Sequence, residues 1–138
     1  MTDTLPIIIP GKPVHSFEIS RMEHRLHIKL PIALKKFYLT YGAARIVFSD
    51  DDKTTINRVL PSFEIMDVLK HQGKHRHVHH FEHYAHMQKN RIPFFETKPN
   101  EFLTIGYLFD NSGKIYDLNE LVANSLAEFT GQGQKAAI

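Results

Sequence analysis

The chain has 138 residues, a formal net charge of +2 at pH 7 and no cysteine; 42% of its residues are hydrophobic, which is enough apolar material for a core. This length fits one domain spanning residues 1–138, and the missing cysteines exclude disulfides, thiolate metal ligands and a thiol nucleophile. The small charge argues against a nucleic-acid partner. No segment reaches the ~20 apolar residues of a membrane-spanning helix, and Asp3 stands where a signal peptide has basic residues, so we expect a cytoplasmic protein.

The first third of the chain predicts two helices that follow an N-terminal extension over residues 1–15. Ser16 suits the N-cap of a helix over residues 17–28, in which the apolar residues keep near-helical spacing. Pro31 suits the first turn of a second helix, and Gly42 suits its C-cap. The second helix carries an i, i+3, i+4, i+7 stripe made of Leu34, Phe37, Tyr38 and Tyr41.

The middle of the chain predicts two short strands and then helices. The strands cover residues 44–48 and 57–61, and the polar segment 49–53 forms the turn between them. Ser62 caps a helix whose buried side chains are expected to be Ile65, Met66, Val68 and Leu69, and which Gly73 interrupts. A further helix is expected over residues 74–89.

The last third predicts strands over residues 92–96 and 102–109, with a loop at 98–100. The Asp-Asn-Ser-Gly sequence at 110–113 is a turn signal, and residues 114–117 form the returning strand. We expect Asn119 to cap a final helix that ends at Gly131, with an inner face of Leu121, Val122, Leu126 and Phe129. Residues 132–138 are expected to be a frayed tail.

Seven of the ten histidines lie between residues 71 and 86. On a helix, His75, His79, His83 and His86 fall within about 80° of arc, so neighbouring imidazoles are spaced to chelate a metal. His79, His83 and His86 are the candidate metal ligands. The catalytic His-Glu-x-x-His pattern is absent, however, and we favour a solvated or pH-responsive partner-binding face.

A second candidate surface is acidic. Asp50, Asp51 and Asp52 lie in one loop that lacks the calcium-loop pattern, so we interpret them as a solvated turn that, with Glu101, is available to a partner. The sequence contains neither of the common phosphate-binding glycine motifs and no Gly-x-Ser-x-Gly elbow. We therefore predict no catalytic residue.

Four motifs occur in a characteristic order along the chain. They are Leu30-Pro31 with Phe37-Tyr38-Leu39 and Gly42, then Ile92-Pro93-Phe94, then Gly113-Lys114-Ile115-Tyr116, and finally Ser125-Leu126-Ala127-Glu128-Phe129. In this order, over about residues 17–131, they resemble the SUKH superfamily, which includes a yeast cell-wall regulator and bacterial polymorphic-toxin immunity proteins.

The resemblance implies an α+β fold, with a mostly antiparallel sheet of about four to six strands and flanking helices. It also implies no cofactor and no catalysis, and the expected function is that of a bacterial immunity protein that binds and blocks a cognate toxin domain. The alternative is a regulatory or scaffold protein with a metal- or pH-responsive histidine face. The oligomeric state stays open.

Overall fold

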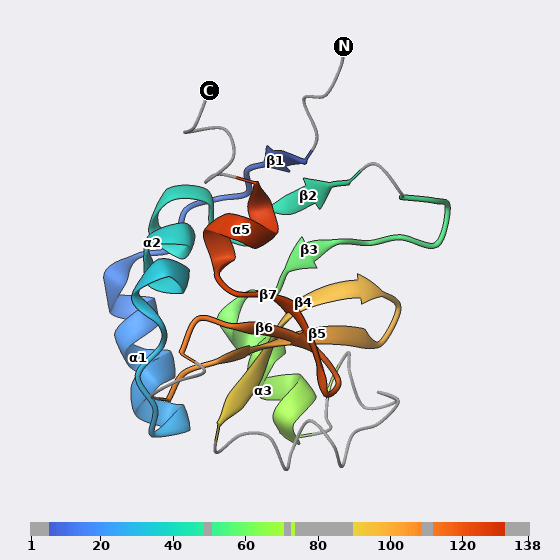
Figure 1. Cartoon of the computed structure of the whole chain (residues 1–138). Helices are drawn as coiled ribbons and strands as arrows, with labels where there is room; N and C mark the ends of the chain where they lie inside the picture. Colours follow the sequence, from blue (N-terminus) through green and yellow to red (C-terminus); the bar gives the residue numbers. More distant parts are fainter. Residues whose placement is uncertain (1–5, 49–50, 71–72, 74–89, 109–111, 132–138) are drawn as a thin grey trace.

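A computed structural model describes residues 6–48, 51–70, 73, 90–108 and 112–131. In this part of the chain, seven strands form one antiparallel sheet, and each strand pairs with the next along the chain. The sheet is curled, and helices lie around it (Figure 1). The strands are β1 (Ile7–Ile9), β2 (Arg45–Val47), β3 (Arg58–Val59), β4 (Arg91–Lys98), β5 (Glu101–Gly106), β6 (Ile115–Asp117) and β7 (Glu120–Ala123).

The predicted α+β class is confirmed, and the strand number slightly exceeds the expected range. Two of the strands come from segments that were not expected to contain them. Ile7–Ile9, in the expected extension, pairs with β2 at the sheet edge. Glu120–Ala123, in the expected final helix, pairs with β6.

The described helices are α1 (Ser16–Leu26), α2 (Ile32–Tyr41), α3 (Ser62–Lys70) and α5 (Leu126–Thr130). The first three lie where apolar spacing predicted them, but the cap of α1 was predicted wrongly. His15 occupies the N-cap position without a side-chain hydrogen bond, and Ser16 is the first helical residue. Pro31 precedes α2 as its N-cap, and Gly42 ends it with a φ of 67°. None of the described helices is long and apolar enough to span a bilayer.

The prediction that Asn119 caps the final helix is wrong. Leu118, with a φ of 55°, and Asn119 form the turn of a β6–β7 hairpin, and Ser125 caps α5 by accepting a hydrogen bond from the backbone N–H of Glu128. The hairpin turn is held from another strand, because the Arg91 guanidinium donates to the Leu118 carbonyl at 2.7 Å. Tertiary pairing has therefore overridden a helix-like spacing.

The core lies between the sheet and the helices. Its largest fully buried side chains include Tyr38 from α2, Phe94 and Phe95 from β4, and Ile105 from β5. The buried Glu23 carboxylate of α1 accepts a hydrogen bond at 2.7 Å from the Leu30 backbone N–H, in the segment before α2, and pairs with Lys35 of α2 at 3.0 Å. α3 packs against β4, and α5 packs against β7 and α2. The predicted helix over 74–89, the tail 132–138 and residues 110–111 of the predicted 110–113 turn lie outside the described residues.

Candidate functional site

A groove opens between the loop that follows β2 and the β4–β5 hairpin. These two segments lie on the same side of the molecule in Figure 1, and the groove has a volume of about 490 Å³. A cleft of this size holds a few side chains of a partner or one small ligand. Its lining residues are Phe48, Asp51, Asp52, Thr55, Asn57, Phe95, Thr97, Lys98, Leu103 and Phe129.

The apolar part of the groove is a cluster of aromatic rings. The Phe129 ring from α5 lies edge-on to Phe95, with 5.1 Å between centroids, and lies 5.4 Å from Phe48. Phe95 is fully buried, whereas Phe48 and Phe129 are half-buried. Because its rings are fixed by core contacts, the groove presents a rigid apolar surface beside solvent.

The acidic rim of the groove is braced by its own hydrogen bonds. Asp51 accepts from the Phe48 backbone N–H at 3.0 Å and from the Asn57 side-chain amide at 2.7 Å. Asp52 Oδ1 accepts from the backbone N–H and the hydroxyl of Thr54, both at 2.8 Å. Carboxylates used in this way hold a turn in one conformation.

Backbone hydrogen bonds tie this loop to the opposite wall. The Ile56 N–H donates to the Thr97 carbonyl at 2.8 Å. In the hairpin, Lys98 is paired in register with Glu101, and the Thr97 hydroxyl donates to the Glu101 carbonyl at 3.2 Å. Asp51, Asp52 and Glu101 therefore lie on two segments that are hydrogen-bonded to each other.

The carboxylate of Asp52 remains charged over a wide pH range. Hydrogen bonds from the hydroxyl and the backbone N–H of Thr54, and the charge of Lys98, hold the pKa of Asp52 below its ordinary value of 3.8. Both Asp51 and Asp52 are exposed to solvent. Asp52 is therefore anionic at neutral pH, and both side chains are accessible to a cationic partner.

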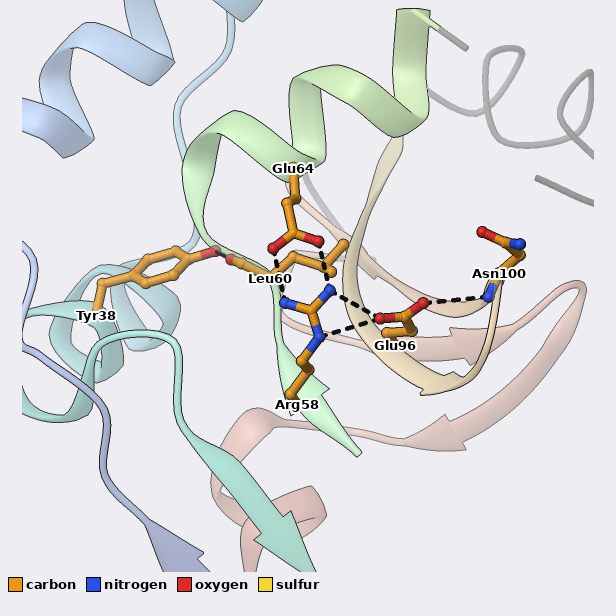
Figure 2. A network of polar contacts seen from close by, with 6 residues as sticks. All are labelled: Tyr38, Arg58, Leu60, Glu64, Glu96 and Asn100. Carbon is orange, nitrogen blue, oxygen red and sulfur yellow. Dashed lines mark hydrogen bonds and ion pairs between the residues drawn. The ribbon is translucent and has the colours of Figure 1, made fainter. Parts of the chain in front are cut away.

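A largely buried ionic cluster links the hairpin to β3 and α3 (Figure 2). Arg58 of β3 bonds Glu64 of α3 through both terminal nitrogens, and it bonds Glu96 of β4 at 2.8 and 3.0 Å. The other oxygen of Glu96 accepts from the Asn100 backbone N–H at 3.1 Å, in the turn that leads to β5. One guanidinium thus connects β3, α3 and the base of the groove wall.

The segment beyond Arg58 is anchored to α2. The Tyr38 hydroxyl donates to the Leu60 carbonyl at 2.6 Å, as Figure 2 shows, and burial raises the pKa of the Tyr38 phenol well above its ordinary value. The hydroxyl therefore stays protonated and able to donate. This contact fixes β3, and with it the end of the acidic loop, relative to the helices.

The predicted candidate residues divide into two groups. Asp51 and Asp52 line the groove, and Glu101 lies beside it on the β4–β5 hairpin, in register with the lining residue Lys98. Asp50 and the histidines His75, His79, His83 and His86 lie outside the described residues. Among the residues that the structure describes, no group of three or more histidine or acidic side chains is arranged to hold a metal ion.

The sequence did not reveal the aromatic floor as part of a site, nor the Arg58 cluster. In the sequence, Phe48 and Phe129 cannot be distinguished from ordinary core residues. Glu96 gives a weak signal, since it is an acid within a strand whose other residues are largely apolar, and a buried acid needs a partner. Nothing in the local sequence identifies Arg58 as that partner.

Comparison with known families gives a match over most of the chain. The model of the SMI1/KNR4 family (SUKH-1) matches residues 13–132. This range includes both walls of the groove, the Arg58 cluster and all the described helices. The comparison with curated proteins gives no match.

Proposed function

Because this chain belongs to the SMI1/KNR4 family (SUKH-1), we propose that it acts by binding another protein, without catalytic turnover. In its specific form, the proposal is an immunity protein that binds a cognate toxin domain and covers its active site. The groove beside Asp52 is the proposed contact surface, and the exposed Glu101 adds a second carboxylate on the adjoining hairpin.

The observation that carries this proposal is a preorganised acidic loop next to a fixed aromatic floor. A loop already held by internal hydrogen bonds loses little conformational entropy on binding. An apolar pocket takes the anchoring side chain of a partner, and charges at the rim accelerate encounter and select partners of opposite sign. The chemistry favours a partner with basic side chains around one or two apolar ones.

A nuclease domain has this kind of surface, because lysine and arginine side chains contact the phosphates of its substrate. Ionised carboxylates on the binder pair with the same side chains. Occupying them would exclude the nucleic acid, and one binder would inhibit one toxin.

The test begins with capture of partners from a lysate of the source cells, followed by purification of any stoichiometric partner and a toxicity assay with and without this protein. The informative variant is Asp52→Asn with Glu101→Gln, which removes two charges and keeps the oxygen acceptors. Its matched control is Asp117→Asn with Glu120→Gln, an exposed acidic pair on the β6–β7 hairpin.

We expect the control to bind like the wild type. The groove variant should bind at least about tenfold more weakly, with slower association and a smaller dependence on salt, because rim charges act mainly on the encounter. The proposal fails if both variants bind the partner equally well, or if a captured partner is not toxic. Running the capture with and without EDTA tests the metal-dependent alternative, in which EDTA abolishes binding.

A further inference from the structure

A second surface carries features that the proposed toxin contact does not use. Phe17, in the first turn of α1, is 67% exposed, and Phe63, in the first turn of α3, is 65% exposed. Both line one groove between the two helices, together with Met22 and Met66. Single exposed apolar residues are common, but large ones gathered around one groove are characteristic of an interaction site.

The charges at this groove are mainly positive. Arg21 and Arg25 line it, one helical turn apart on α1, and both are exposed. Glu18 is the one acidic side chain lining it. Within the described part of the chain, neither arginine forms an ion pair. Arginine and aromatic side chains together are the composition of binding hot spots.

This surface is separate from the acidic groove. α1 lies at one side of the molecule in Figure 1, and the loop after β2 lies at the other side. The two grooves share no lining residue. Their charges are of opposite sign, so they suit partner surfaces of opposite chemistry.

We propose that the α1–α3 groove is a second docking site, which binds an acidic amphipathic segment of a partner protein. Large apolar side chains of that segment insert between Phe17 and Phe63, onto the half-buried Met66. Its Asp or Glu side chains pair with Arg21 and Arg25. Methionine adapts its shape to different apolar side chains, and arginine pairs with carboxylates through two parallel hydrogen bonds.

The apolar floor favours a peptide over a nucleic acid. Nucleic-acid binding rests on many phosphate contacts, whereas this groove offers two arginines and one opposing acid. A helical segment with apolar residues on one face and acids beside them satisfies both parts of the groove at once.

The test is selection from a library of random short peptides displayed on phage, with the intact protein as the target. Enriched peptides are synthesised, and their contacts are mapped by amide chemical shifts on the protein. We expect peptides rich in Asp or Glu and in large apolar residues, with shifts concentrated in α1 and α3. Binding should weaken as salt is added.

Two groove variants and two controls decide the outcome. Phe17→Ala with Phe63→Ala, and separately Arg21→Gln with Arg25→Gln, should each weaken peptide binding at least about tenfold. Leu121→Ala with Val122→Ala, an exposed apolar pair on β7, should leave it unchanged. Asp52→Asn with Glu101→Gln should also leave it unchanged, so failure of the toxin proposal and failure of this one are distinguishable.

The proposal is overturned if the enriched peptides lack acids, if they shift other parts of the protein, or if the groove variants bind them as tightly as the wild type. It is also overturned if a single-stranded oligonucleotide shifts the same residues and displaces the peptides. All the substituted side chains are exposed, and folding is checked for each variant by circular dichroism.

Discussion

Replacement of Arg58 by Met should be among the most destabilising single changes at a charged residue of this protein. The guanidinium is the shared partner of Glu64 and Glu96, whose side chains are only 5% and 4% exposed. Met retains much of the side-chain volume and removes the charge with its hydrogen bonds. Two largely buried carboxylates then lose the cation that they share (Figure 2).

The expected cost follows from burial. Removing one partner of a buried ion pair costs about 3–5 kcal/mol, because the remaining charge is left uncompensated. Here two carboxylates lose a partner, although Glu96 keeps its hydrogen bond from Asn100. We therefore expect a loss in the free energy of unfolding near the upper end of that range, out of the roughly 5–15 kcal/mol that a domain typically has.

The assay is equilibrium unfolding in urea, followed by circular dichroism, with wild type and variant compared under the same conditions. The matched control is Arg45→Met. Arg45 lies directly opposite Arg58 in the β2–β3 ladder but is exposed, so its loss should change stability by less than about 0.5 kcal/mol. A second arm replaces Arg58, Glu64 and Glu96 together with apolar residues, and it should recover much of the loss, because no buried charge remains. A loss below about 1 kcal/mol for Arg58→Met, or an equal loss for the control, would refute the reasoning.

Two further changes test local features. Gly42→Ala should cost at least about 3 kcal/mol in the free energy of unfolding, because a Cβ at its φ of 67° would clash with the Lys12 carbonyl. Gly113→Ala, at a φ of 84° but with open space around it, should cost about 1 kcal/mol, and equal losses in urea unfolding would contradict this reasoning. Thr54→Ala should raise the pKa of Asp52 toward 3.8, because it removes the hydroxyl that stabilises the ionised carboxylate; carboxyl-carbon NMR titration measures the change. Because the pKa is lowered in the folded protein, the ionised form contributes stability above pH 3.8, and this contribution is lost as pH falls through the folded-state pKa. An unchanged titration midpoint would show that the Thr54 hydroxyl is not the cause.

The acidic loop shows which part of the candidate site can be predicted from local sequence. The run of aspartates identified a polar turn, and Asp51 and Asp52 lie in one. Their hydrogen bonds go to residues no more than six positions away, so the turn itself is a local structure. Its position against Thr97 of the β4–β5 hairpin is set by sheet pairing and was not visible in the spacing of residues.

The wrong prediction of a helix from Asn119 arose because long-range contacts, and not local ones, determine this part of the chain. Leu121, Val122, Leu126 and Phe129 have a spacing that fits one helix face, yet the first two are exposed on a strand. The positive φ of Leu118 allows the chain to reverse, and Arg91 holds the turn from β4. A leucine in this conformation gives no signal in the sequence, because the turn depends on a distant side chain.

By itself, the sequence determined the elements whose stabilising contacts are local. The apolar stripes of α1, α2 and α3 and the apolar run of β4 follow from burial on one face or within one strand, and they are readable one segment at a time. The ordered motifs likewise determined the family, whose match covers residues 13–132.

Only the tertiary structure decided which charges meet. Arg58 and Glu96 are 38 positions apart and Arg58 and Glu64 are six apart, and their association depends on how β3, β4 and α3 pack. The same packing sets the acidic loop beside an aromatic floor from α5, and it leaves Phe17 and Phe63 on one surface. Contacts of this kind leave no periodic pattern in the sequence, because they arise when separate helices and strands pack around a common core.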